Sequence, residues 1–78
     1  QILENVHVLD KETALNDFDV KTSIEEAAKM LGSRGRVLVR ASGTEPVVRV
    51  MAEAETEELC KSAVNIVIDT MKSKGLII

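Results

Sequence analysis

Two β-branched runs joined by a short turn-like segment limit the folds open to this chain more than any other feature. Gly35 opens RVLVRAS and Pro46 opens VVRVMAEA, with ASGTE between them. Two strands linked by a short loop that contains glycine are typical of a β-hairpin. Because a lone hairpin is marginal in water, the rest of the chain must cover one of its faces.

Two helices are expected to provide that cover. The first is predicted over residues 23–31, because Thr22 and Ser23 precede glutamates at capping-box spacing and Gly32 follows as a left-handed terminator. Its apolar stripe comprises Ile24, Ala27, Ala28 and Leu31.

The second helix is predicted between Thr56, its N-cap, and Gly75, a stretch too long for one strand. A broad stripe suited to lying across a sheet is formed by Leu59, Cys60, Ala63, Val64, Ile66, Val67, Thr70 and Met71. The final GLII is either a short extra strand or a frayed tail.

An N-terminal strand is predicted over residues 2–9. Side chains alternate between the faces of a strand, which places Val6 and Val8 on one face and Asn5 and His7 on the other. His7 has no evident partner in the sequence, and we expect it to be a partly exposed strand residue.

Residues 10–21 are expected to form a polar connection with Phe18 as its anchor, and a short edge strand could form there. The predicted order is β-α-β-β-α, an α+β fold in which two helices pack on one face of a small, largely antiparallel sheet. Residues 1–78 form a single domain with a modest core. Cys60 is the only cysteine, so no internal disulfide forms, and a free thiol suits the cytoplasm.

The charge distribution is uneven. Residues 34–49 carry four arginines against Glu45, or +3, whereas the remainder carries six lysines against twelve acids, or −6. An arginine cluster on an acidic domain favours a site for a planar or tetrahedral anion. The alternative is chance clustering with surface ion pairs.

The segment from Arg40 to Arg49 suits a bound phosphate. Its two terminal arginines supply forked donors, and Ser42 and Thr44 add hydroxyls. Gly43 allows an unusual backbone dihedral, which would turn successive N–H groups toward one anion. The alternative is a polar hairpin loop in which Ser and Thr bond their own backbone.

Strand parity predicts that the two arginines lie on the same face, away from the helices. With Arg40 opposite Val47, Arg40 and Arg49 would be diagonal neighbours roughly 7–8 Å apart, within reach of a shared ligand. Glu45 either accepts from N–H groups of the loop or pairs with an arginine.

RVLVRASGTEPVVRVMAEAE closely resembles the C-terminal phosphate-binding loop of the α-D-phosphohexomutases, and most of all the bacterial branch that acts on glucosamine phosphate. The close match covers about 20 residues, and the flanking elements fit the last domain of that family. The resemblance implies that the loop holds the non-reacting phosphate of the substrate through Arg40, Ser42, Gly43, Thr44 and Arg49. It implies no catalytic and no metal-binding residue in this chain.

The resemblance also implies an isomerase that interconverts glucosamine 6-phosphate and glucosamine 1-phosphate through a phosphoserine and a bisphosphorylated sugar, for UDP-N-acetylglucosamine and cell-wall precursors. Mg²⁺ assists in the full-length enzyme and is not bound by this fragment. The phosphoserine, magnesium and sugar-contacting loops have no counterpart here. We therefore expect other domains of the same polypeptide as partners and no activity from this piece alone. The start at Gln1 favours a piece of a longer protein over processing.

Other function classes are weaker. Phe18 is the only aromatic residue, and single-stranded nucleic acids need aromatic platforms. No stretch approaches the roughly 20 apolar residues of a membrane span. The alternatives left open are the same domain of a phosphomannomutase or phosphoglucomutase, and a stand-alone ligand-binding or interaction module.

Overall fold

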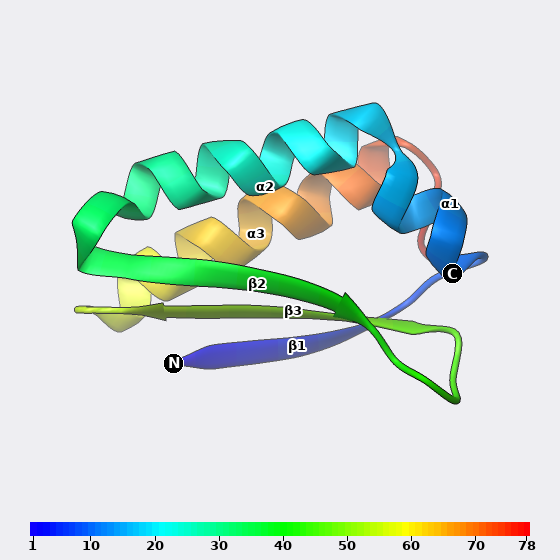
Figure 1. Cartoon of the computed structure of the whole chain (residues 1–78), viewed down its shortest axis with the longest axis horizontal. Coiled ribbons are helices and arrows are strands. Elements are labelled where there is room, and N and C mark those ends of the chain that lie inside the picture. The colour runs from blue at the N-terminus through cyan, green and yellow to red at the C-terminus, as the bar shows by residue number, and fades with distance from the viewer.

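A computed structural model of the chain describes residues 1–78 and shows a layer of helices on a three-stranded sheet (Figure 1). The strands are β1 (Ile2–His7), β2 (Gly35–Ala41) and β3 (Val47–Ala54). The helices are α1 (Lys11–Asn16), α2 (Phe18–Leu31) and α3 (Glu57–Ser73), with a 3-10 turn, η1 (Gly32–Arg34), after α2. The α+β class is confirmed, in the order β-α-α-β-β-α.

The predicted hairpin provides the central strand, β3, and one edge strand, β2. The strand order is β1-β3-β2, and both pairs are antiparallel. Val48 and Val50 of β3 are fully buried beneath the helices, as the alternation predicts. The opposite face of the sheet carries no helix, so the residues that point to it meet solvent (Figure 1). We call it the open face.

Residues 10–21 contain α1 and the first turn of α2, so the prediction of a polar connection with room for an edge strand was wrong. The side chain of Asp10 accepts from the N–H groups of the first turn of α1 and so caps it. Asp17 caps α2 in the same way. Phe18, expected to anchor the segment, is 79% exposed and anchors nothing in this chain.

The predicted helix over residues 23–31 is the C-terminal part of α2, which begins five residues earlier. It ends as expected at Gly32, which has a φ of 56°. Its expected caps lie inside the helix instead. Ser23 is buried and its hydroxyl donates to the carbonyl of Val20 at 2.6 Å, so the hydroxyl is satisfied within α2.

The helix predicted after Thr56 is confirmed as α3. Its cap hydroxyl accepts from the N–H of Leu59 at 3.2 Å. The stripe predicted on this helix packs on the sheet, and its buried members are Cys60, Ala63, Val64, Val67 and Met71. The C-terminal tail is neither a full strand nor frayed, because Ile77 forms one antiparallel bridge with Val8.

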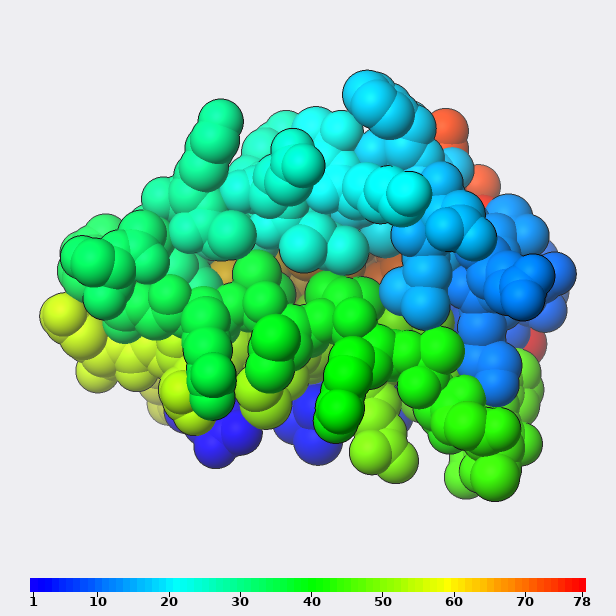
Figure 2. Space-filling view, in the orientation of Figure 1, coloured from blue at the N-terminus to red at the C-terminus, as the bar shows by residue number.

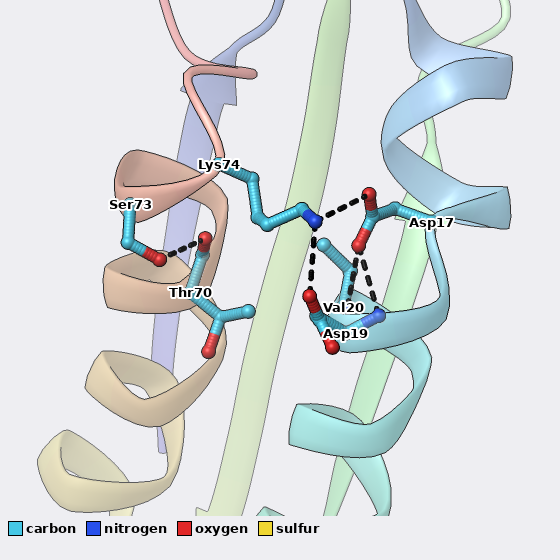
Figure 3. A network of polar contacts seen from close by, with 6 residues as sticks. All are labelled: Asp17, Asp19, Val20, Thr70, Ser73 and Lys74. Carbon is cyan, nitrogen blue, oxygen red and sulfur yellow. Dashed lines mark hydrogen bonds and ion pairs between the residues drawn. The ribbon is translucent and has the colours of Figure 1, made fainter.

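Lys74, just after α3, ties the end of that helix to the start of α2 (Figure 3). Its Nζ lies 2.9 Å from a carboxylate oxygen of Asp19 and 3.7 Å from one of Asp17. The hydrogen bond that Lys74 donates to Asp19, and then the charges of Asp17 and Asp19, raise the pKa of Lys74 above 10.5.

Candidate anion-binding site

Arg40 and Arg49 face each other directly across β2 and β3, on the open face of the sheet. Both are exposed. The shared face was predicted correctly, but the register was not, because Arg40 pairs with Arg49 rather than with Val47. Pro46 has no N–H to donate to the strand ladder, so regular pairing starts beyond it and the loop is longer than expected.

Neither of these two arginines forms an ion pair. By contrast, Arg36 lies 3.2 Å from Glu53 across the same pair of strands. Of the four arginines in the sequence cluster, Arg36 forms an ion pair, whereas Arg34, Arg40 and Arg49 form none. Like charges directly opposite each other destabilise a sheet, and here no carboxylate relieves the repulsion.

The loop between these strands is organised by Ser42. The N–H of Ser42 donates to the carbonyl of Val47 at 2.8 Å, which closes the loop. The Ser42 hydroxyl oxygen accepts from the N–H groups of Thr44 and Glu45, each at 3.4 Å. A hydroxyl used as an acceptor keeps its own proton free to donate, so Ser42 can still bind an anion.

Gly43 does not have the backbone conformation predicted for it. Gly32 and Gly75 are the only residues with a positive φ, so the loop forms without a left-handed turn at Gly43. A Cβ atom built on Gly43 would meet nothing within 4 Å. Gly43 and Thr44 are both exposed, and they leave the space above the loop open.

Lys11 is a cation of this region that the sequence did not reveal. It is the first residue of α1, and its Nζ donates to the carbonyl of Ser42 at 2.7 Å. The contact joins residues 31 positions apart. It fixes the start of the loop to the helical layer and adds a positive charge beside it.

Glu45 plays neither of the two parts considered for it. Its carboxylate makes no hydrogen bond and no ion pair with an arginine, and only its backbone takes part in the loop. The charges around the two facing arginines are thus not balanced from within the loop.

Arg49 borders two hollows on the open face. One, of about 130 Å³, is lined by Leu3, Leu38, Arg40, Arg49 and Met51. The other, of about 120 Å³, is lined by Asn5, His7, Ser42, Glu45, Val47 and Arg49. The structure thus brings Arg49 together with Arg40 in the first and with Ser42 in the second, whereas Gly43 and Thr44 line neither. Figure 2 shows side chains of β2 projecting below the helical layer.

The chain contains no group of three His, Cys, Asp or Glu side chains placed to ligate a metal. None of its helices combines the length and the apolar character that crossing a membrane requires. The hairpin offers guanidinium, hydroxyl and backbone N–H donors, all of which suit an oxyanion.

The fold and the hairpin define a small α+β domain with an exposed, uncompensated arginine pair beside a Ser-Gly-Thr-Glu-Pro loop. Residues 3–69 match the family described as "Phosphoglucomutase/phosphomannomutase, C-terminal domain". The chain belongs to this family, which confirms the resemblance seen in the sequence.

Several phosphoglucosamine mutases are similar to the chain over nearly its whole length. The one from Lachnospira eligens is 56% identical over 75 residues, which cover 96% of this chain and 17% of the relative. The one from Geobacillus kaustophilus is 50% identical over 72 residues, 92% of this chain and 16% of the relative. The one from Bacillus subtilis is 49% identical over 74 residues, 95% of this chain and 16% of the relative. The chain thus spans 16–17% of the length of these relatives.

Proposed function

We propose that this chain is the substrate-phosphate-binding domain of a cytoplasmic phosphoglucosamine mutase. In this proposal the whole enzyme interconverts glucosamine 6-phosphate and glucosamine 1-phosphate, and this domain holds the phosphate that is not reacting. The residues that would bind this phosphate, which we call the grip, are Arg40, Ser42, Gly43, Thr44 and Arg49. The similarity to phosphoglucosamine mutases supports the choice of sugar.

The observation that carries the proposal is the direct opposition of Arg40 and Arg49 without a carboxylate partner. Such a pair is unfavourable in the free domain, and a dianion between the guanidinium groups would convert repulsion into charge-assisted hydrogen bonding. A guanidinium stays charged at any physiological pH, so the grip does not depend on a proton.

The exposure of the site suits its proposed part in the reaction. A sugar bisphosphate intermediate presents either of its two phosphates to the same grip, so the grip must recognise phosphate rather than one sugar position. The donors surround an open loop with free space above Gly43, so the sugar attached to the phosphate can lie in more than one orientation. Phosphoryl transfer depends on positioning and electrostatics, and this domain would supply positioning.

The chemical step in this proposal belongs to the other domains of the same polypeptide, which are its partners. A phosphoserine there would exchange the phosphoryl group with the sugar, and Mg²⁺ would be bound there as well. This chain has no fitting ligand cluster for that ion, so no part of its proposed role passes through the metal.

The proposal can be tested by NMR titration of the ¹⁵N-labelled chain. We expect inorganic phosphate and glucosamine 6-phosphate to shift the backbone amides of residues 40–49, and unphosphorylated glucosamine to leave them in place. Arg49→Gln should weaken phosphate binding by about 10- to 100-fold, because a hydrogen bond to a charged group contributes roughly 1.5–3 kcal/mol.

Arg34→Gln is the matched control. Arg34 is also exposed and free of ion pairs, but it lies in η1, at the far end of β2 from the loop. Its loss should leave the affinity for phosphate nearly unchanged. Equal effects of the two substitutions would show non-specific attraction, and amide shifts confined to the helices would favour an interaction module instead.

A further inference from the structure

His7 lies in the wall of the hollow that also contains Ser42 and Arg49. The hollow has a volume of about 120 Å³, and a water molecule occupies about 30 Å³ in the liquid, so a phosphate-sized group fits. Two of the proposed phosphate ligands and the imidazole thus border one space. His7 comes from a strand remote in sequence from the loop.

The direction of the His7 side chain is fixed by its neighbours in β1. Val6 is 8% and Val8 0% exposed, because both point into the core. Alternation then turns His7 to the open face, on the same side as Arg49. His7 pairs with Val47, the residue that accepts the hydrogen bond closing the loop.

The backbone around His7 is held on both sides. The N–H of Val8 donates to the carbonyl of Pro46 at 2.9 Å, which attaches β1 to the exit of the loop. On the other edge, the N–H of Ile78 donates to the carbonyl of His7 at 3.0 Å. The main chain at His7 is therefore tied to the exit of the loop on one side and to the C-terminal tail on the other.

The imidazole has donors to offer and no partner within the chain. No hydrogen bond or ion pair involves its side chain. A neutral imidazole presents one N–H donor and an imidazolium two. Asn5 adds an amide to the same wall, whereas Glu45 is the one acidic group that borders the hollow and opposes an anion there.

We propose that His7 is a further ligand of the anion held by Arg49 and Ser42, donating an N–H to an oxygen of the phosphate monoester. This inference rests on the proposed function and extends the grip from the hairpin to β1. The phosphate would then be contacted from two segments that only the folded sheet brings together.

The test uses the fact that His7 is the only histidine of the 78 residues, so its imidazole Cε1–H signal is unique. The signal is followed at constant pH while inorganic phosphate, and separately glucosamine 6-phosphate, is added. We expect the imidazole signal to shift and to saturate with the same midpoint as the amides of residues 40–49. A midpoint that differs, or a stationary imidazole signal while those amides shift, overturns the role of His7 and leaves the proposed function standing.

Variants give a second readout. His7→Ala should weaken phosphate binding by about 3- to 10-fold, the loss expected for one hydrogen bond, and His7→Gln, which keeps an N–H donor, should restore part of it. An unchanged affinity in folded His7→Ala overturns the inference. If neither ligand moves the amides of residues 40–49 in the unsubstituted chain, the proposed function fails, and the inference fails with it.

Discussion

Arg40 and Arg49 occupy opposite positions in a strand pair where like charges are unfavourable. A domain selected only for stability would place an acid at one of them, as in the Arg36–Glu53 pair four residue pairs away. Under the proposed function, this uncompensated pair lowers the stability of the free domain and provides the binding site for a ligand. A substitution at either arginine should therefore affect folding and phosphate binding in opposite directions.

We predict that Arg40→Gln stabilises the free domain and weakens the liganded one. Removing one of two opposed charges should raise the free energy of unfolding by about 0.2–1 kcal/mol in phosphate-free buffer of low ionic strength. Added phosphate should reverse the order, because it binds the folded parent more tightly and stabilises it by mass action. Urea denaturation with and without phosphate measures both effects. Destabilisation in the absence of phosphate would contradict this account.

Two glycines of the hairpin should respond differently to the same substitution. A Cβ on Gly35 would overlap the carbonyl oxygen of Glu53, whereas one on Gly43 meets nothing within 4 Å. We expect Gly35→Ala to cost about 1–3 kcal/mol through displaced backbone, and Gly43→Ala to stay within about 0.5 kcal/mol of the parent. Thermal unfolding of the two variants provides the comparison. A larger loss in Gly43→Ala than in Gly35→Ala would show that the loop geometry is wrong.

At the scale of elements, the sequence predicted those segments whose burial pattern is periodic. The hairpin and α3 were predicted because alternating valines and a long apolar stripe each fit one kind of element. The helix α1 was missed because it is 6 residues long and buries only Ala14, so it leaves no stripe to detect. The first turn of α2 was missed for a related reason, since its one aromatic residue, Phe18, points to solvent.

The link between α3 and α2 through Lys74 gives a pH prediction. The pKa of Lys74 is raised above 10.5 by Asp19 and Asp17, so the charged lysine favours the folded chain. That contribution is fully present at neutral pH and is lost as the pH rises above 10.5, through the folded-state value. The stability difference between the parent and Lys74→Gln should therefore be constant at neutral pH and shrink in strong alkali.

The measurement is urea denaturation of both proteins over that pH range. Because all the other lysines titrate in both, the difference between the two curves isolates Lys74. Added salt at neutral pH should also reduce the difference, since the ammonium group is exposed to screening. A difference that grows above pH 10.5 would contradict the ion pair.

For the whole molecule, we predict no mutase activity from these 78 residues alone. They correspond to 16–17% of the length of the related mutases and contain no metal-ligand cluster. The chain should bind phosphate and yet form no glucosamine 1-phosphate from glucosamine 6-phosphate and Mg²⁺, as followed by ³¹P NMR. Product formation that is proportional to the amount of purified chain and disappears in Arg49→Gln would contradict the prediction that the chemical step needs other domains.

The candidate site was predictable only where it is local in sequence. Five of its members lie within residues 40–49, where a motif can be recognised. Lys11 reaches the same loop through the packing of α1, and His7 through the pairing of β1. No spacing in the sequence predicts such contacts. The register of the arginines also depended on how the loop closes, through the bond from Ser42 to Val47.

The strand order β1-β3-β2 affects how the domain is made as well as how it works. Val6 pairs with Val48, so during translation the first strand waits until its partner has emerged. At 5–20 residues per second this delay is about 2 to 8 seconds. In that interval the apolar side of β1 is accessible to chaperones or to a neighbouring nascent chain. Pairing with β3 of the hairpin then removes that access.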